Sequence, residues 1–150
     1  MGTNGGACIY DGKALNNISQ KDGLPNDAVH RILEDKSGNL WFGTTHQGIS
    51  RFDGKEFKNF TEEGIVEGKE IWCIHEDHLG NVWFSGKRFG LYRYDGNSFT
   101  NFDEKDGMVS AGLMSIFEDK SGRLWLGGVQ GLFRYDGKSF VRVTRDGPWR

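Results

Sequence analysis

Hydrophobic residues in this chain fall into short runs that glycine and aspartate interrupt, and no segment keeps the 3.6-residue period of an amphipathic helix. Runs such as Leu40–Gly43 and Val82–Ser85 contain consecutive apolar residues. Consecutive apolar positions predict strands that are buried on both faces, as where one sheet is stacked on another. The pattern therefore predicts an all-β chain of short strands joined by tight turns.

The same pattern returns at a fixed interval, which is the signature of a tandem repeat. Trp41, Trp83 and Trp125 stand 42 residues apart, and the glycines three positions before them keep the same two intervals. Asp-Gly pairs recur at intervals of 42, 42 and 41 residues and begin at Asp11, Asp53, Asp95 and Asp136.

Each repeat resolves into four strands. In the first complete copy we expect them at Val29–Asp35, Leu40–Gly43, Ile49–Asp53 and Glu56–Thr61. The corresponding strands of the two later copies are Ile71–Asp77, Val82–Ser85, Leu91–Asp95 and Ser98–Asp103, then Leu113–Asp119, Leu124–Gly127, Leu132–Asp136 and Ser139–Thr144.

Two kinds of turn join these strands. The first and second strands flank Asp-x-x-Gly, as at Asp35–Gly38, where the aspartate can accept hydrogen bonds from turn amides and the glycine can take a positive φ. The third strand ends in aromatic-Asp-Gly, as at Phe52–Gly54. That tripeptide predicts a type I′ hairpin, which needs a positive φ at both central residues.

Four strands in about 42 residues, with a tryptophan and regular glycines, indicate the blade of a β-propeller. Ala7–Asp11 and Lys13–Ile18 match the third and fourth strands of a repeat, and Gly2-Thr3 match the end of a second strand. The sequence thus predicts a single propeller segment over 1–150 with three full blades and a half blade, 14 strands in all. The half blade covers 1–28 and the blades cover 29–70, 71–112 and 113–150.

Three and a half blades do not make a ring, because propellers usually close with four to eight blades. Apolar sheet faces would then remain in water. We therefore expect either self-association, with a dimer favoured, or a piece of a longer chain. Two copies would supply 28 strands, numerically seven blades, but each spare hairpin is an outer pair, so closure of that ring does not follow from the count.

Charge and composition exclude several classes of function. Lys and Arg total 19 against 21 Asp and Glu, a net charge of −2, so no basic surface for nucleic acid is expected. No apolar window is long enough for a transmembrane helix, and no signal peptide precedes the repeats. Cys8 and Cys73 are expected as two buried thiols, with a disulfide or a metal site as alternatives. The four histidines lack the spacing of a zinc motif, so we predict no metal and no cofactor.

The segments Gly23–Val29 and Ile32–Thr44 closely resemble the two-component regulator propeller repeat, and the resemblance extends over nearly the whole chain. Gly64–Glu67 and Gly107–Ser110 depart from the Gly-Leu-Pro pattern of the first copy. The resemblance implies a periplasmic or extracellular sensor domain of a bacterial hybrid histidine kinase, often for sugars. The segment Asn39–Phe42 is also similar to streptogramin-lyase propellers.

Comparison of the copies separates architecture from candidate function. Residues present in every copy are expected to build the blade, whereas residues that differ are free to bind a ligand. The recurring arginines at 51, 93 and 134 are expected on the strand surface, paired with neighbouring acids. The expected architectural residues are the core tryptophans Trp41, Trp83 and Trp125 and the turn-forming aspartates Asp35, Asp77 and Asp119.

The loops between second and third strands, and the entries into first strands, differ sharply between copies and lie on one rim. By general precedent loops of this kind bind ligands. Their donors, cations and rings would suit a polar or acidic small molecule or a carbohydrate, and the alternative is ordinary variation of solvated loops. The candidate residues are His30, His46, Gln47, Trp72, Lys87, Arg88, Phe89 and Gln130.

Three functions remain open from the sequence. The first is a non-catalytic ligand-binding or sensor module, and the second is a structural or protein-interaction propeller with no small-molecule ligand. The third is an enzyme, either a lyase of the streptogramin-lyase type or a glycan-processing enzyme, which needs a base and an electrophile held together. His75 and Glu76 are neighbours in an expected strand, so they point to opposite faces and cannot cooperate. We therefore predict that the chain is not an enzyme.

Overall fold

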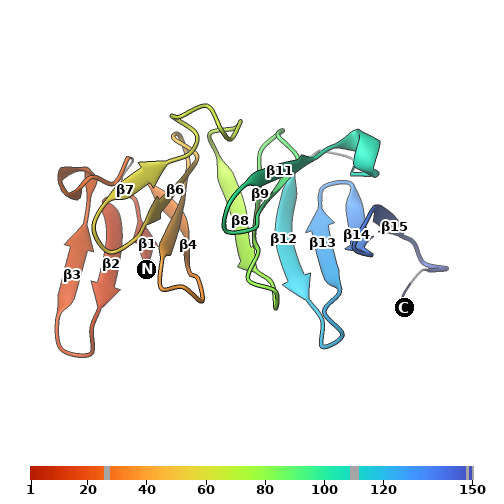
Figure 1. Ribbon diagram of the computed structural model, residues 1–150, viewed down its shortest axis with the longest axis horizontal. Helices are drawn as coiled ribbons and strands as arrows, with labels where there is room; N and C mark the ends of the chain where they lie inside the picture. The colour runs from red at the N-terminus through yellow and green to blue at the C-terminus, as the bar shows by residue number, and fades with distance from the viewer. Residues whose placement is uncertain (26–27, 109–111, 148, 150) are drawn as a thin grey trace. The chain divides into compact units, whose positions relative to one another are not determined.

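The computed structural model describes residues 1–25, 28–108, 112–147 and 149. In these residues the chain forms fifteen strands and two short 3₁₀ helices, and every strand pairing is antiparallel (Figure 1). The chain divides into two compact units, residues 1–71 and 72–150. None of the helices in the described residues is long and apolar enough to cross a membrane.

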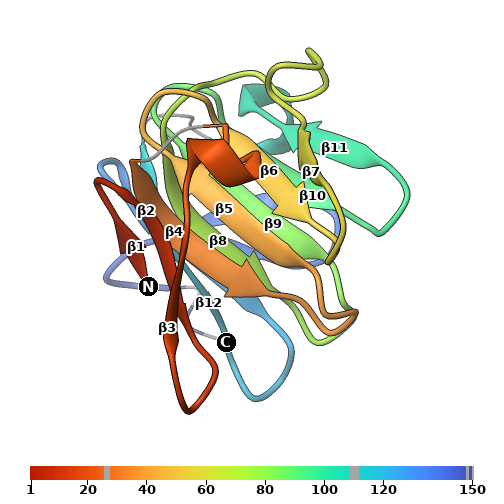
Figure 2. The same ribbon diagram turned by 90° about the vertical axis from the view of Figure 1, so that its left-hand side faces the viewer.

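The first unit contains two sheets, and in both the strands follow chain order (Figure 2). A three-stranded sheet comprises β1 (Gly2–Thr3), β2 (Gly6–Tyr10) and β3 (Leu15–Ile18). A four-stranded sheet comprises β4 (Val29–Glu34), β5 (Leu40–Thr44), β6 (Ile49–Phe52) and β7 (Phe57–Asn59). Between them lies η1 (Gln20–Asp22), which Ser19 caps through a hydrogen bond from the amide of Lys21.

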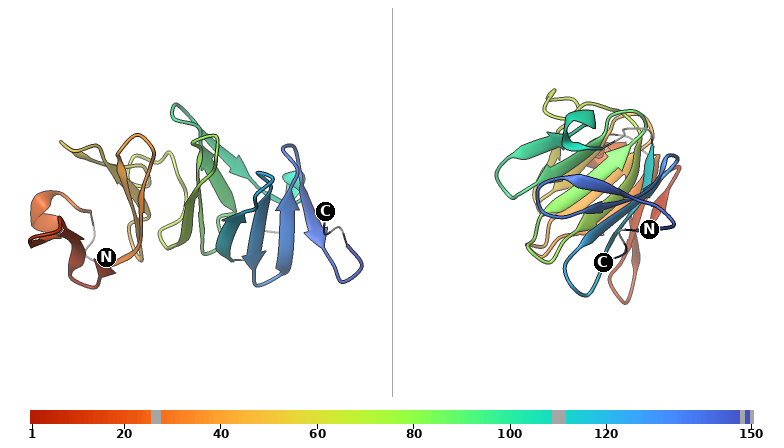
Figure 3. Two further views of the ribbon diagram at one scale, coloured as in Figure 1. Left: turned by 90° about the horizontal axis from the view of Figure 1, so that it is seen from below. Right: turned by 90° about the vertical axis from the view of Figure 1, so that its right-hand side faces the viewer.

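The second unit contains two four-stranded sheets of the same kind (Figure 3). The earlier sheet comprises β8 (Ile71–Glu76), β9 (Val82–Gly86), β10 (Leu91–Tyr94) and β11 (Phe99–Phe102). The later sheet comprises β12 (Leu113–Glu118), β13 (Leu124–Gly128), β14 (Gly131–Tyr135) and β15 (Phe140–Val143). The helix η2 (Glu104–Asp106) lies between the two sheets in sequence.

The predicted fold class is confirmed: the chain is all-β, and its complete repeats are four-stranded antiparallel meanders. One detail differs from the prediction. Gly2 and Thr3 pair with Ala7 and Gly6, so the first sheet has three strands instead of the expected two. The short strand β1 accounts for the difference between the predicted 14 strands and the fifteen observed among the described residues.

The type I′ turn predicted at the aromatic-Asp-Gly sites is wrong. Gly54 has φ of 97°, but Asp53 does not share a positive φ, because Arg88 is the one described non-glycine residue with that conformation. Instead, Oδ1 of Asp53 accepts hydrogen bonds from the amides of Lys55 and Glu56 at 2.8 and 3.0 Å. The side chain therefore closes a wider turn in which only the glycine needs a positive φ. The same bonding recurs at Asp11, Asp95 and Asp136.

Aromatic rings fill the space between the two sheets of the second unit. Trp83 is 1% exposed, stacks on Phe102 at 5.6 Å and meets the edge of Tyr135 at 5.3 Å. Tyr135 in turn stacks on Phe140 at 4.7 Å. In the first unit, Trp41 stacks on Phe60 at 5.5 Å in the same manner. Rings of this size supply most of the buried area that a small blade can offer.

Two of the recurring arginines contact core rings in addition to attracting a neighbouring acid: after the turn amides, the charges of Arg51 and Arg93 help to lower the pKa values of Asp53 and Asp95. The guanidinium of Arg51 lies 5.7 Å from the ring centre of Trp41 and 5.6 Å from that of Phe60. Arg93 repeats this arrangement over Trp83 and Phe102 at 5.7 and 5.6 Å. These are cation–π contacts, which stabilise by roughly 0.5–2 kcal/mol depending on burial. In these two blades the strand arginine therefore covers core rings of its own blade.

Candidate functional site

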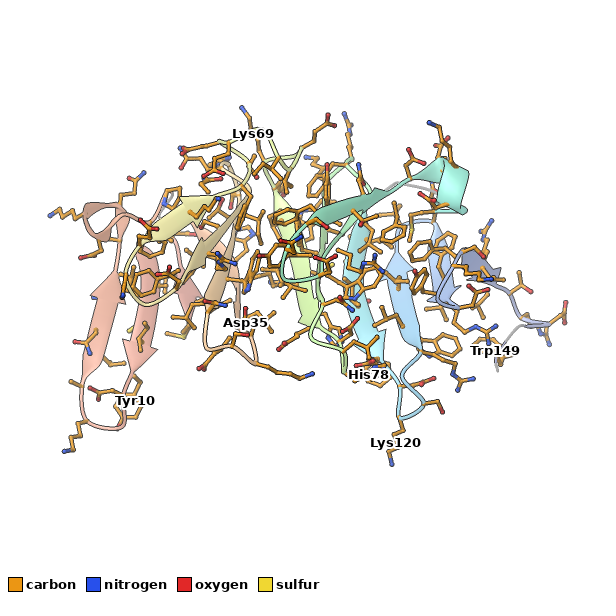
Figure 4. The ribbon with its side chains drawn as sticks, viewed as in Figure 1. Tyr10, Asp35, Lys69, His78, Lys120 and Trp149 are labelled. Carbon is orange, nitrogen blue, oxygen red and sulfur yellow. The ribbon has the colours of Figure 1, made fainter. Side chains whose placement is uncertain are left out.

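Each sheet has two chemically different ends. One end, here called the hairpin rim, carries the turns between first and second and between third and fourth strands. The other, the loop rim, carries the loops between second and third strands and the connections into the next first strand. In the first unit, Figure 4 shows Tyr10 and Asp35 near one end and Lys69 at the opposite end.

The hairpin rim is nearly uniform from copy to copy. Oδ1 of Asp77 accepts from the amides of Leu79 and Asn81 at 3.0 and 2.8 Å, and Oδ2 accepts from the indole of Trp83 at 2.8 Å. Burial raises the pKa of the Asp77 carboxyl, but these hydrogen bonds together lower it below its ordinary value of 3.8. The same bonding occurs at Asp35 with Trp41 and at Asp119 with Trp125.

The loop rim of the first unit holds three of the candidate residues. His46 and Gln47 line a hollow of about 330 Å³ together with Thr61, Glu62 and Lys69. The amide oxygen Oε1 of Gln47 is buried there and has no hydrogen-bond partner among the described residues. This hollow offers both donors and acceptors, and no Trp, Tyr or Phe is among the described residues that line it.

His30 lies at an irregular position of β4, where the pairing with β5 shifts register between Val29 and Arg31. Its side chain is exposed, and its Nε2 lies 2.8 Å from Oγ1 of Thr45 in the β5–β6 loop. The contact places His30 beside the loop that carries His46 and Gln47.

The loop rim of the second unit holds the other five. Lys87 and Arg88 are exposed in the β9–β10 loop, and Phe89 lies half-buried, 6.0 Å from the ring of Tyr92. Arg88 has φ of 65°. A non-glycine residue in this left-handed region costs of order 1–3 kcal/mol, and such strain is concentrated at functional loops. Gln130 is exposed in the β13–β14 turn.

Trp72 has a partly structural role. A Cβ on Gly112 would lie 2.7 Å from Cζ3 of Trp72, so the indole packs directly on the backbone of this glycine. The same Cβ would lie 3.3 Å from the side chain of Val129 in the β13–β14 turn. One part of the Trp72 ring is therefore covered, and the half-buried remainder is what could meet a ligand.

A cluster that sequence reasoning missed lies on the hairpin rim of the second unit. His78 contacts Oε1 of Glu118 through Nδ1, and its amide donates to Oε2 of Glu118 at 2.9 Å. Nε2 of His75 lies 3.9 Å from the same Oε2. His78 and Glu118 are 40 residues apart, two fewer than the repeat. The residue that corresponds to His78 in the next repeat is Lys120, and Glu118 lies two positions before it. Comparing each turn residue with the residues just before its counterpart in the next repeat would have suggested this contact between adjacent blades.

Neither cysteine forms a disulfide. Cys8 in β2 is half-buried, and Cys73 in β8 is buried, with its Sγ 3.8 Å from the carbonyl oxygen of Leu113. Across the part of the chain that the structure describes, no group of three or more His, Cys, Asp or Glu side chains is arranged to hold a metal ion.

Comparison with protein families identifies the repeat. The model of the family described as two component regulator propeller matches residues 23–46 and 107–130. Each match runs from the loop before a first strand, through the Asp-x-x-Gly turn, to the loop after the second strand. The second match includes Gly107, where the sequence departs from the Gly-Leu-Pro pattern of the first copy. A comparison with curated proteins gives no match.

Several solved structures share the fold. The extracellular domain of BT3049 from B. thetaiotaomicron, assigned as a hybrid two component system, is 23% identical with a TM-score of 0.76, over 91% of this chain and 20% of that chain. The extracellular domain of BT4673 from the same organism is 18% identical with a TM-score of 0.75, over 97% of this chain and 23% of that chain. A catalytically inactive virginiamycin B lyase from Staphylococcus aureus, solved with quinupristin, is 18% identical with a TM-score of 0.70, over 94% of this chain and 48% of that chain.

The chain thus spans between about a fifth and a half of the length of these proteins, and at such identities the likeness concerns the fold. Meander sheets of four strands, a 42-residue interval and two matches to one family lead to the same conclusion. Residues 23–46 and 107–130 thus match repeats of the two-component regulator propeller family, and the chain folds as a segment of a β-propeller.

Proposed function

We propose that residues 1–150 form one propeller segment that acts as a non-catalytic, ligand-recognising module of a bacterial sensor, on the outer side of the cytoplasmic membrane. The half blade would cover 1–28 and the blades 29–70, 71–112 and 113–150. The family match and the extracellular domains of two-component systems among the structural neighbours support this proposal. On this proposal the loop rim meets the ligand.

The observation that carries the proposal is the contrast between the two rims. On the hairpin rim, the aspartate between the first and second strands of each complete blade accepts hydrogen bonds from turn amides and from a tryptophan of its own blade. On the loop rim the blades differ, and one of them holds Arg88 in a strained conformation with its side chain exposed. Strain that the fold does not require is best explained by a task for the side chain.

The chemistry of the loop rim favours a polar ligand with acidic groups. Lys87 and Arg88 are adjacent exposed cations, and arginine binds carboxylates through two parallel hydrogen bonds. Gln130 adds a neutral donor and acceptor on the following blade, and the exposed part of Trp72 adds an aromatic face. A sugar acid or an acidic oligosaccharide has a carboxylate for the cations, hydroxyl groups for the amide and a ring face for the indole.

A non-catalytic role agrees with the histidine geometry. His75 and Glu76 are consecutive in β8 and so point to opposite faces. His78 contacts Glu118 through Nδ1, and this pair lies on the hairpin rim, away from the candidate ligand residues of the loop rim. The virginiamycin B lyase shares the fold only, at 18% identity, and contributes no residue role.

Titration calorimetry with neutral and acidic sugars would test the proposal. We expect an acidic sugar to bind, and the double variant Lys87→Ala/Arg88→Gly to weaken binding at least tenfold, because it removes both cations. Lys120→Ala is the matched control, since it removes an exposed cation from the hairpin rim of the same unit. Binding that survives the loop-rim variant and disappears in the control would overturn the assignment.

Self-association is a second proposal that one observation favours. Inside the second unit Tyr135 meets the Trp83 ring and stacks on Phe140, and Tyr10 and Leu15 occupy the corresponding positions of the first sheet. Tyr10 and Leu15 are 65% and 70% exposed. We propose that a second copy of the chain covers them, with a dimer as the favoured form. Light scattering that reports a monomer across the concentration range would contradict this.

A further inference from the structure

A hollow of about 360 Å³ lies on the hairpin rim of the second unit. Its walls are the β8–β9 turn at Asp77–Asn81, the β12–β13 turn at Ser121–Leu124, and the side chains of Arg93 and Tyr135. His78 and Lys120 mark this end of the unit in Figure 4. The volume falls within the range of small-molecule sites, roughly 300–1,000 Å³.

Arg93 is the unusual member of this wall. Its guanidinium lies over Trp83 and Phe102, and its Nε is buried without a hydrogen-bond partner. Among the residues that the structure describes, none is hydrogen-bonded to this Nε. A guanidinium carries five N–H donors, and a half-buried cation with unmet donors normally has an acceptor nearby.

The carboxylates around the hollow are not that acceptor. Asp77 is bonded to its own turn and to Trp83, and Glu118 is bonded to His78. Oδ1 of Asp136 accepts from the amides of Lys138 and Ser139, both at 2.9 Å. These three negative charges disfavour a bare anion. They suit a molecule whose hydroxyl groups donate to the remaining lone pairs.

The first unit provides a natural comparison. A hollow of about 320 Å³ lies at the corresponding place there and is lined mainly by apolar residues, among them Ile32, Leu40 and Phe42. Ile9 lines it and stands two repeats before Arg93. The cation is therefore specific to the hollow in the second unit, although arginine recurs at this strand position in the later blades.

We propose that the hollow lined by Arg93, Tyr135 and the β8–β9 and β12–β13 turns binds a small hydroxylated carboxylate, such as a hydroxy acid or a sugar acid. The Arg93 guanidinium would take the carboxylate. Asp136 and the side chains of Asn81 and Ser121 would take the hydroxyls. This site lies on the rim opposite to the one in the functional proposal and does not depend on it.

NMR titration of the full chain with gluconate would test the inference, because Trp83 lines the hollow and the signal of its indole N–H can report on binding there. We expect saturable shifts with gluconate, and affinities at least tenfold weaker for glucose, which lacks the carboxylate, and for acetate, which lacks the hydroxyls. Arg93→Met keeps an apolar stem over the rings and should abolish the shifts. Arg134→Met is the matched control: Arg134 occupies the same repeat position and its Nε is equally unpartnered, but it does not line this hollow.

A second measurement covers the case in which Arg93→Met fails to fold. Burial raises the pKa of Tyr135, and the positive charge of Arg93 works against that rise. A carboxylate bound to Arg93 would cancel part of this charge, so gluconate should raise the Tyr135 pKa further, whereas glucose should not. An unchanged Tyr135 titration at saturating gluconate would contradict the inference.

The location of the shifts separates the two proposals. Gluconate shifts around Lys87 and Arg88 alone would overturn this inference and support the loop rim. Shifts at the Trp83 indole alone would support it and count against the loop rim. An absence of shifts at both places would overturn both.

Discussion

The indole N–H of Trp83 donates to Oδ2 of Asp77 at 2.8 Å, so a core ring and a surface turn are joined by one hydrogen bond. The equivalent distances are 2.8 Å for Trp41 with Asp35 and 2.9 Å for Trp125 with Asp119. The other carboxylate oxygen meanwhile organises the turn amides. The first turn of every complete blade is thereby fixed to the tryptophan of its second strand.

Asp77→Ala should destabilise the protein by about 2–4 kcal/mol, because a buried indole N–H loses its acceptor and the turn amides lose theirs. Urea unfolding would measure the change. Asp53→Ala is the control, since that exposed aspartate bonds only turn amides, and its loss should be smaller. Equal losses at both positions would show that the tryptophan bond adds nothing.

Acid should weaken the fold through the same aspartates. Hydrogen bonds lower the pKa values of Asp35, Asp77 and Asp119 below 3.8 in the folded chain, against burial at Asp35 and Asp77. The unfolded chain therefore takes up protons first as the pH falls. The stabilisation is complete above about pH 5 and is lost progressively below about pH 4. Urea midpoints measured from pH 7 to pH 3 should follow this course, and Asp77→Asn should flatten it.

Gly90 and Gly96 form a matched pair for the cost of a side chain. Both have positive φ, 76° and 96°, but a Cβ on Gly90 would lie 2.6 Å from the carbonyl oxygen of Phe102, whereas one on Gly96 meets nothing within 4 Å. Gly96→Ala should cost about 1 kcal/mol from backbone strain alone. Gly90→Ala should cost roughly 2–4 kcal/mol, because β10 and β11 must also separate. Similar melting temperatures for the two variants would contradict this.

Arg88→Gly should raise stability by about 1 kcal/mol, since glycine adopts the left-handed conformation without strain. Thermal unfolding would detect the gain. Lys87→Gly is the control, because the neighbouring lysine has no positive φ to relieve and should gain nothing. A loss of stability in Arg88→Gly would mean that the arginine side chain supports the loop. The strained backbone at Arg88 would then no longer support a ligand-binding role for the loop rim.

His78→Ala should cost about 1 kcal/mol, because Glu118 loses its contact with the His78 imidazole between the two sheets of the second unit. His78→Lys should restore most of that loss, since Lys36 and Lys120 occupy this position in the other copies. Urea unfolding of both variants would measure these changes in the free energy of unfolding. If lysine proves no better than alanine, the contact requires the imidazole geometry and not a cation.

Much of the fold was readable from sequence because the repeat presents each element three times. The 42-residue interval of the tryptophans located the strands, and the glycines located their turns. The type I′ turn failed because the Asp53 side chain, which a pattern of residue types does not orient, replaced a backbone conformation. The ring contact of Arg93 was also missed, since only the register of β9 with β10 places this residue opposite Trp83.

Less of the candidate site than of the fold could be predicted from the sequence. Sequence variation selected the loop rim, and the structure adds the strain at Arg88 and the contact of Trp72 with Gly112, which depend on backbone geometry. The hollow beside Arg93 escaped notice because comparison of copies treats a recurring arginine as structural. The chemistry of this hollow depends on the side chains that the neighbouring blade places opposite the arginine. Those side chains differ between blades, although the arginine recurs.

The Asp–Trp hydrogen bond has a consequence for how such proteins lengthen. The donor and the acceptor are six residues apart within one repeat. A duplicated blade therefore carries this hydrogen bond within itself and needs no compensating substitution in another blade. Blade number can therefore change by whole-repeat gain or loss, whereas contacts such as His78 with Glu118 must be re-selected at every new junction.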